Sequence, residues 1–318
     1  MTSQKRIFMT GASGHIGSEI IRLALADGHS IRALSRTPES DTKLRSLGAV
    51  PVRGDLTSLA VLRTESAAAD VVLHLATAYV FGGAPYESIR HIDFAAVDAI
   101  ADGLAGTDKP LVATSGTLIV AADPAGAETD EASPIGSNEL HTRMLTETHS
   151  LGLKNRGIRV MAVRLAPFVH GHGRSGVAQL MDMGAKAGCI TVIDGGGNRT
   201  TTVHVDDAAR LYLLAAEKGK VGDVYNASAS TEVTLREMSE AMAEAVCVPV
   251  RDITKEQVEK EFGPMMAFFL SVENRASGAK ARKELGWEPK GMGVLEDIRQ
   301  GSYQAVAKAL RKCENFAC

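Results

Sequence analysis

Short apolar runs alternate with amphipathic segments of helical length over the first 170 residues. The apolar runs predict strands at residues 6–9, 30–35, 50–52, 71–75, 111–113 and 160–165. Apolar positions at helical spacing predict helices at residues 18–27, 42–47, 59–68, 92–104 and 138–153. Strands that alternate with helices form βαβ units around a parallel sheet. We therefore predict an α/β fold built on a Rossmann-type, doubly wound parallel sheet.

The pattern changes after Pro167. Glycines become frequent, the apolar runs shorten, and a helix is predicted over residues 233–246, with Thr234 marking its start. We predict a first domain over residues 1–168 and a smaller C-terminal α/β lobe over residues 169–318. Residues from about 200 to 228 are expected to return to the first sheet. The Met- and Phe-rich segment 265–270 is interpreted either as an apolar ligand lid or as a helix packed in the lobe or against another subunit.

Composition narrows the class of protein. The 318 residues are 45% hydrophobic and 23% charged, and 35 Lys and Arg against 38 Asp and Glu give a net charge of −3. The chain has no excess of basic residues that would favour binding to nucleic acid. No apolar run reaches the roughly 18–20 residues of a membrane span. The four cysteines form no CxxC pair, and no signal-peptide core precedes the first strand. We expect a reduced cytoplasmic protein whose partner is a small-molecule substrate, with no nucleic acid or membrane partner; a homodimer is compatible with this.

A glycine-rich turn, Thr10-Gly11-Ala12-Ser13-Gly14-His15-Ile16-Gly17, lies directly between the first strand and the first helix. Gly11 permits the sharp turn, Gly14 lets the backbone approach a pyrophosphate, and Gly17 allows close packing of helix on strand. The helix N-terminus adds backbone N–H groups for the phosphates. This context predicts a dinucleotide site that includes Ser13, His15 and Ile16 with the three glycines.

The end of the second strand distinguishes the two nicotinamide cofactors. A carboxylate there would bind the ribose 2′-hydroxyl of NAD, whereas an arginine accommodates the 2′-phosphate of NADP. The segment reads Leu34-Ser35-Arg36-Thr37, with no carboxylate before Glu39. Arg36 therefore favours NADP over NAD, unless it is only a solvated surface charge.

Further cofactor contacts are expected where the other strands end, because ligands bind outside the carboxyl ends of a doubly wound sheet. These residues are Asp55 and Leu56 after the third strand, Leu75, Ala76 and Thr77 after the fourth, and Pro167 after the sixth. Asp55 is interpreted either as an acceptor for the adenine amino group or as a cap of the following helix. No metal site is expected, because His170-Gly171-His172 lacks a third ligand nearby.

The sequence resembles the extended branch of the short-chain dehydrogenase/reductase superfamily, which includes NAD-dependent epimerases and dehydratases. The glycine turn, Gly54-Asp55-Leu56 and His74-Leu75-Ala76 match its pattern. So do the segments Arg164–Gly171, Val203–Ala209 and Ala281–Pro289, in the family's order. The resemblance spans residues 7 to about 298 and implies the Rossmann fold, a nicotinamide cofactor and a second lobe that binds the substrate.

The family's catalytic pattern is absent. The resemblance implies a Ser or Thr hydroxyl after the fifth strand and a Tyr-x-x-x-Lys on the next helix, but none of the five tyrosines has a lysine four residues on. Alignment on Glu147 places the tyrosine and lysine positions at Glu139 and Arg143, and alignment on Gly157 places them at Asn138 and Thr142. The strict match puts Gly116 at the hydroxyl position, between Ser115 and Thr117.

Other residues are therefore candidates for the chemistry. Ser115 is expected to bind a carbonyl oxygen, Arg143 to supply a positive charge to the ribose or the oxyanion, and His170 or His141 to supply the proton. Glu139 in a dry pocket is an alternative acid. Each of these polar residues is otherwise interpreted as part of a solvated helix face or a hydrogen-bonded loop.

Three functions remain open. The first is an NADP(H)-dependent oxidoreductase acting on a carbonyl or alcohol of a small, rather apolar metabolite. The second is a redox-neutral isomerase, epimerase, lyase or cyclase, and the third is a non-catalytic NADP-binding regulator. A sugar-nucleotide substrate is disfavoured, because the position that carries a diphosphate-binding arginine in such enzymes of the family is Thr200, one residue after Arg199.

Overall fold

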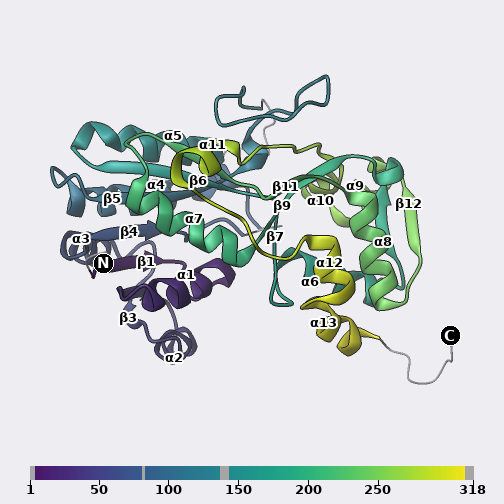
Figure 1. Cartoon of the computed structure of the whole chain (residues 1–318), viewed down its shortest axis with the longest axis horizontal. Coiled ribbons are helices and arrows are strands. Elements are labelled where there is room, and N and C mark those ends of the chain that lie inside the picture. Colours follow the sequence, from purple (N-terminus) through teal and green to yellow (C-terminus); the bar gives the residue numbers. More distant parts are fainter. Residues whose placement is uncertain (1–3, 81–82, 137–142, 312–318) are drawn as a thin grey trace.

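A large parallel sheet flanked by helices forms one end of the molecule, and a smaller lobe forms the other (Figure 1). The computed structural model describes residues 4–80, 83–136 and 143–311. The large sheet has seven strands in the order β10-β6-β5-β4-β1-β2-β3, and every pair in it is parallel. The doubly wound Rossmann-type sheet predicted from the sequence is confirmed.

The first half of the chain supplies most of the large sheet. Its strands are β1 (Arg6–Thr10), β2 (Ser30–Ser35), β3 (Val50–Arg53), β4 (Val71–His74), β5 (Pro110–Gly116) and β6 (Arg159–Leu165). Its helices are α1 (His15–Ala26), α2 (Pro38–Ser46), α3 (Leu59–Ala68), α4 (Tyr86–Leu104) and α5 (Arg143–Gly152), with short 3₁₀ turns at Thr117–Ile119 and Leu153–Arg156. The strand order reverses between β1 and β4, which is where ligands bind in such sheets.

Three predicted helices start earlier in the structure than expected: α1 begins at His15, not at residue 18, and α2 and α4 differ by more. α2 begins at Pro38, not at residue 42, because the Thr37 side chain accepts a hydrogen bond from the Ser40 N–H and Pro38 occupies the first helical position. α4 begins at Tyr86, six residues before the predicted start. Tyr86 is buried while the residues after it are mostly exposed, so the apolar periodicity does not reveal these first turns. The starts of α2 and α4 depend on a local cap or a single buried ring, which the wider apolar pattern does not resolve.

The later part of the chain builds the smaller lobe and also returns to the large sheet. Two small sheets, β11-β9-β7 and β12-β8, belong to this part of the chain, and β10 pairs with β6 in the large sheet. The strands are β7 (Phe168–His170), β8 (Ile190–Ile193), β9 (Arg199–His204), β10 (Val224–Ala227), β11 (Ser230–Thr234) and β12 (Val250–Ile253). The helices are α6 (Ser175–Ala187), α7 (Val205–Lys218), α8 (Leu235–Val246), α9 (Lys255–Phe262), α10 (Pro264–Ser271), α11 (Ala279–Leu285), α12 (Val294–Gln300) and α13 (Tyr303–Leu310), with a 3₁₀ turn at Asp194–Gly196.

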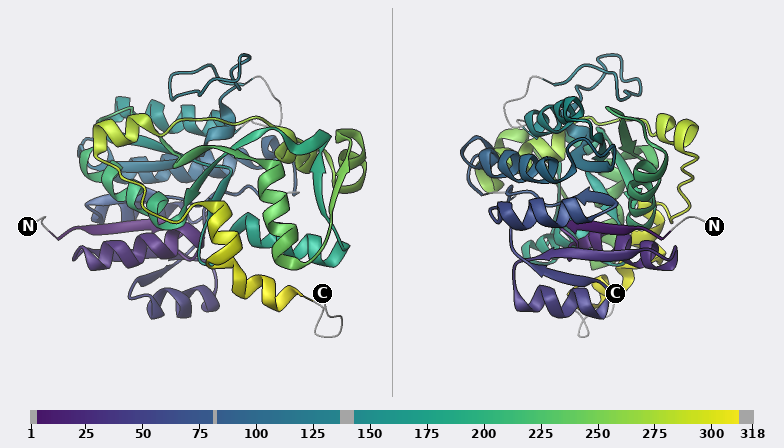
Figure 2. Two further views of the ribbon diagram at one scale, coloured as in Figure 1. Left: turned by 45° about the vertical axis from the view of Figure 1, so that its right-hand side comes forward. Right: turned by 90° about the vertical axis from the view of Figure 1, so that its left-hand side faces the viewer.

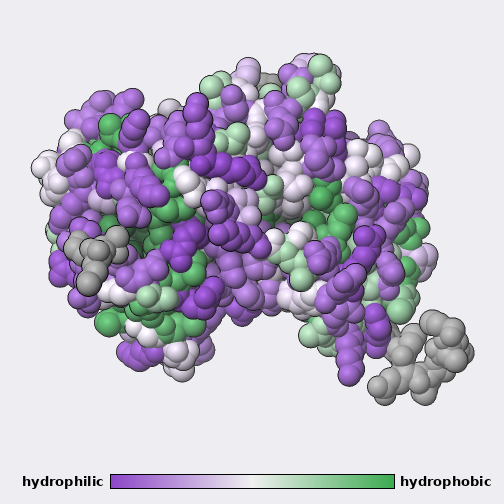
Figure 3. All heavy atoms as spheres, viewed as in Figure 1, coloured by the Kyte–Doolittle hydropathy of each residue, from purple (hydrophilic) through white to green (hydrophobic). Residues whose placement is uncertain are grey.

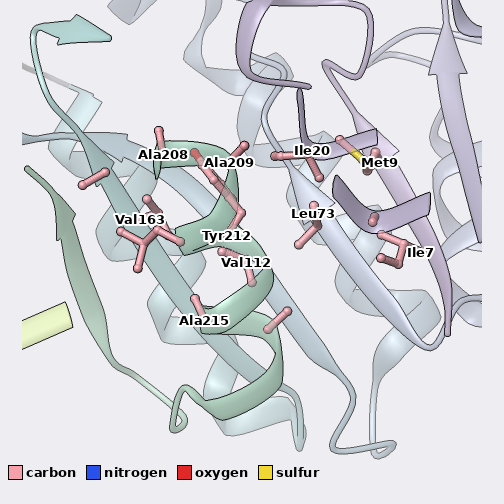
Figure 4. Close-up of a cluster of buried hydrophobic side chains, with 14 of the residues drawn as sticks. Ile7, Met9, Ile20, Leu73, Val112, Val163, Ala208, Ala209, Tyr212 and Ala215 are labelled. Carbon is pink, nitrogen blue, oxygen red and sulfur yellow. The ribbon is translucent and has the colours of Figure 1, made fainter. Parts of the chain in front are cut away.

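α1 and α7 cover one face of the large sheet, and α3, α4 and α5 cover the other (Figures 1 and 2). The core between the sheet and the first pair of helices includes Ile7, Leu73, Val112 and Val163, with Tyr212 of α7 packed on them (Figure 4). A separate apolar core fills the smaller lobe. Burial of these two cores fixes the strand ends that carry the predicted site.

The Met- and Phe-rich segment forms α10 and belongs to the core of the smaller lobe. Ala267 and Leu270 are buried, and the rings of Phe269 and Phe168 lie 5.1 Å apart. An apolar pocket between α6, α8 and α10 is lined by residues such as Met183, Met242 and Met266, none of which is a predicted site residue. No helix in the described part of the chain is long and apolar enough to cross a membrane, and hydrophilic side chains cover most of the face drawn in Figure 3.

Candidate functional site

The glycine turn has the geometry expected of a dinucleotide site. Gly11 has φ +70°, and a Cβ atom there would lie 2.9 Å from the Ala76 nitrogen, so β1 and β4 approach closely at this point. A Cβ on Gly17 would lie 2.4 Å from the Gly11 oxygen, so helix and turn are in direct contact. A Cβ on Gly14 meets only the Gly11 oxygen, at 3.1 Å. The backbone at Gly14 is therefore open to a ligand, and the residues present fit a pyrophosphate over the start of α1.

The end of β2 carries a free arginine. Arg36 is exposed, and its guanidinium has no hydrogen-bond or ion-pair partner within the described residues. The nearby carboxylate of Asp41 is paired with Arg53. The guanidinium therefore remains available to an anionic ligand.

Two other predicted contacts have partners within the protein. One carboxylate oxygen of Asp55 accepts hydrogen bonds from the N–H and hydroxyl of Thr57, and these bonds lower the pKa of Asp55. The Thr77 hydroxyl donates to the buried carboxylate of Asp93, 2.7 Å away, and the Ala78 N–H donates to the other oxygen of that carboxylate. Asp93 of α4 therefore holds the segment that follows β4 in place.

Ser115 lies at the carboxyl end of β5, directly opposite Arg164 of β6. Side chains in register on neighbouring parallel strands point to the same face, here the face covered by α5, because Arg164 pairs there with Glu147. Ser115 is 5% exposed, and its hydroxyl has no hydrogen-bond partner within the described residues. The preceding residue, Thr114, points to the other face, where its hydroxyl lies 2.7 Å from the hydroxyl of Tyr212.

Of the other three proposed catalytic residues, the structure describes the side chain of His170 alone. His170 is buried in β7, beside His204 of β9, and its Nδ1 lies 3.2 Å from a carboxylate oxygen of Asp297. His141, together with the alternative acid Glu139 and both other alignment positions, lies outside the described residues. Arg143 is the first residue of α5, and its side chain is outside the description as well.

The hydroxyls of four tyrosines, Tyr86, Tyr212, Tyr225 and Tyr303, are hydrogen-bonded within the fold. Tyr212 bonds to Thr114, Tyr225 donates to Asp223, and Tyr303 donates to the Arg174 carbonyl. Tyr86 donates to Asp93 at 2.6 Å, and its oxygen also lies 2.6 Å from the Thr146 hydroxyl of α5. The Tyr86 bonds join α4 to α5.

Two cations that the sequence analysis did not single out, Lys43 and Arg174, lie around the glycine turn, near the predicted cofactor residue His15. Lys43 of α2 donates a hydrogen bond of 2.5 Å to the Ser13 carbonyl. Arg174 begins α6 and carries an exposed guanidinium with no partner within the described residues. The Nε2 atom of His15 is buried without a partner, and burial, followed by the charge of Arg174, lowers the pKa of His15 to about 4. No local motif marks Lys43 or Arg174, because only tertiary packing brings α2 and the loop after β7 toward the turn.

His172, on the loop after β7, lies within ion-pair distance of carboxylates on α1 and α7. Its Nε2 lies 2.9 Å from Asp206 and 3.8 Å from Glu19 of α1. These three residues place one ligand atom each within 4.8 Å of one another, a spacing that a metal ion could bridge. Arg22 already pairs with both carboxylates, so the arrangement is an ion-pair network.

Arg199 is occupied within the smaller lobe. Its guanidinium pairs with Glu273 at 3.0 Å and donates to the Gly126 carbonyl at 3.2 Å. The Arg199 backbone N–H also donates to Glu273. Two nitrogens of the arginine nearest the diphosphate position are therefore engaged within the protein, and Thr200, which occupies that position, is buried.

The model of the NAD dependent epimerase/dehydratase family matches residues 7–228 of the chain. An uncharacterized protein of Schizosaccharomyces pombe is 34% identical over 299 residues, which cover 94% of this chain and 99% of the yeast protein. A 4-hydroxy-2-methyl-3-oxo-4-farnesyl-3,4-dihydroquinoline-1-oxide ketoreductase of Stigmatella aurantiaca is 28% identical over 235 residues, which cover 73% of this chain and 70% of the enzyme.

Solved structures share the fold. The UDP-glucose 4-epimerase of Thermus thermophilus, in complex with NAD, has a TM-score of 0.74 and 21% sequence identity, over 94% of this chain and 99% of that one. At this identity the likeness concerns the fold alone, both the Rossmann domain and the second lobe.

Proposed function

Because the chain belongs to the NAD dependent epimerase/dehydratase family, we propose that it is an NADP(H)-dependent oxidoreductase that interconverts a carbonyl and an alcohol on a small, rather apolar metabolite. The observation that carries the proposal is the end of β2, where Arg36 is exposed and free of partners within the described residues and no carboxylate precedes Glu39. A guanidinium in that place matches a 2′-phosphate, whereas it lacks the acceptor oxygens with which a carboxylate binds the ribose 2′-hydroxyl.

The substrate class rests on the second lobe. Arg199 pairs with Glu273 and donates to the Gly126 carbonyl, so within the described residues the arginine next to the diphosphate position is already engaged inside the fold, which disfavours a sugar nucleotide. A relative of similar length in this family is a ketoreductase whose named substrate carries a farnesyl chain. A ketone or alcohol on an apolar molecule agrees with both observations.

The nicotinamide of the cofactor supplies or accepts the hydride. The chain's own part is to hold the carbonyl and to provide a proton. Ser115 can donate a hydrogen bond to the carbonyl oxygen, since its hydroxyl at the carboxyl end of β5 has no partner among the residues that the structure describes. Arg143 is proposed as the cation beside the ribose or oxyanion, and His141 or His170 as the proton source.

Cofactor choice tests this proposal directly. The purified protein should bind NADPH more tightly than NADH, and Arg36→Ala should abolish that preference while leaving NADH affinity unchanged. Titration by calorimetry measures both affinities, and absorbance at 340 nm across a panel of apolar ketones and alcohols measures turnover. Equal affinity for the two cofactors in the wild-type protein would contradict the NADP assignment.

A redox-neutral isomerase, epimerase, lyase or cyclase is the second candidate. The tyrosine hydroxyls that pair with Thr114, Asp223, Asp93 and the Arg174 carbonyl favour it, since none of them belongs to a Tyr-x-x-x-Lys. Cofactor that remains bound through purification, with no absorbance change at 340 nm on any of the panel compounds, would favour this candidate over the first.

A further inference from the structure

An exposed arginine of the smaller lobe, Arg174, lies directly before α6 on the loop that follows β7. We propose that Arg174 binds the pyrophosphate of the dinucleotide, closing it from the side of the second lobe while the glycine turn holds it from the large domain. This inference rests on the proposed dinucleotide site and assigns it a residue outside the glycine motif.

The backbone around Arg174 is fixed in an unusual conformation. Gly171, His172, Gly173 and Ser175 all have positive φ, between 54° and 117°, which His and Ser rarely adopt. The start of α13 holds this loop in place: the Ser302 hydroxyl accepts from the Gly173 N–H, and the Tyr303 hydroxyl donates to the Arg174 carbonyl at 2.7 Å. Strain that the surrounding structure maintains is typical of loops that place a functional side chain.

The same loop lies against the first turns of α1. His172 reaches Glu19 and Asp206, and its ring lies 5.4 Å from that of His204. Because Glu19 is one helical turn beyond His15, the loop that carries Arg174 stands beside the N-terminus of α1. Burial is the main cause that lowers the pKa values of His15 and Lys43. The positive charge of Arg174 is the second cause for both residues.

Lys43 lies at the glycine turn through its bond to the Ser13 carbonyl, and the loop that carries Arg174 lies beside the same end of α1; neither cation forms an ion pair with a carboxylate within the described residues. The acidic side chains of this region, Glu19 and Asp206, are already paired with Arg22 and His172. Two neighbouring cations over a turn whose backbone is open at Gly14 fit an anion with more than one phosphate. Since Lys43 is bonded to the Ser13 carbonyl and Arg174 is free within the described residues, Arg174 is the group that can move onto the ligand.

Affinity measurements on the full chain test this assignment. Arg174→Ala should weaken NADPH, NADH and ADP-ribose by a common factor of about ten, because all three share the pyrophosphate. Arg174→Lys should recover part of the loss, and the salt dependence of ADP-ribose binding should be shallower in Arg174→Ala than in the wild type. The matched control is Arg251→Ala, which removes an exposed arginine from another part of the smaller lobe.

Each result bears on Arg174 separately from the cofactor preference. Unchanged affinities in Arg174→Ala, relative to Arg251→Ala, would overturn the inference. A loss confined to NADPH would also overturn it, because Arg174 would then contact the 2′-phosphate. Arg36→Ala gives a different pattern, a loss of affinity for NADPH alone. If the NADP proposal fails, Arg174→Ala should still weaken all three ligands, so the two failures can be told apart.

Discussion

The Nδ1 atom of His74 lies 2.8 Å from the hydroxyl oxygen of Thr10, and this contact joins the ends of β4 and β1 where the glycine turn begins. The Thr10 hydroxyl also accepts a hydrogen bond from the Ala76 N–H, so both strands are tied to one side chain. His74 is 5% exposed, and its burial lowers its pKa from 6.5 to about 4. The imidazole at the centre of the strand reversal is therefore neutral at physiological pH.

Stability should fall in mild acid because of His74. Its folded pKa is lower than its unfolded value, so the unfolded chain binds the extra proton as pH falls from about 6.5 toward 4. The free energy of unfolding should decrease by about 2 kcal/mol between pH 8 and pH 5 on account of this residue. Urea unfolding at both pH values, in the wild type and in His74→Asn, measures the effect. A variant at the exposed His91 is the control, and an unchanged pH dependence in His74→Asn would contradict the assignment.

Two glycine substitutions should separate folding from cofactor binding. A Cβ at position 17 would lie 2.4 Å from a backbone oxygen, so Gly17→Ala should destabilise the fold by several kcal/mol. A Cβ at position 14 meets only one atom, at 3.1 Å, so Gly14→Ala should leave the melting temperature within a few degrees. Its methyl group would occupy the path of the pyrophosphate, and affinity for NADPH and NADH should fall at least about tenfold. A Gly14→Ala protein that binds both cofactors normally would argue against this path.

The sequence predicted the sheet and the glycine turn because both depend on local patterns. Apolar runs recur at strand length, and Gly11, Gly14 and Gly17 each have a stereochemical reason visible in the spacing. Lys43 could not be predicted because it reaches the Ser13 carbonyl only when α2 packs against the turn, and Arg174 could not because its loop lies against α1 only in the folded protein. The pairing of Arg199 with Glu273, 74 residues away along the chain, is likewise a product of tertiary packing.

The pair formed by Arg164 and Glu147 should contribute to stability only as long as it is complete. Both side chains are about 95% buried and joined by two hydrogen bonds, of 2.7 and 2.9 Å. Glu147→Gln leaves a buried guanidinium without its counter-charge, which costs about 3–5 kcal/mol in comparable pairs. Glu261→Gln, at the exposed pair with Arg251, should cost less than about 1 kcal/mol. Chemical denaturation measures the free energy of unfolding of both variants. Similar losses in the two would contradict the expected dependence of Arg164 on its buried counter-charge.

Ser115 should show opposite effects on folding and on turnover. Its buried hydroxyl has no partner within the described residues, so Ser115→Ala removes an unsatisfied polar group and should leave stability unchanged or raise it by about 1 kcal/mol. If the hydroxyl binds the substrate carbonyl, the same variant should lose at least about tenfold in kcat while its NADPH affinity is retained. Thr114→Ala is the matched control, since the Thr114 hydroxyl bonds to Tyr212 and to the His74 carbonyl, and its loss should lower stability first. Wild-type kcat in Ser115→Ala would exclude the hydroxyl from the reaction and leave the carbonyl to be bound from α5.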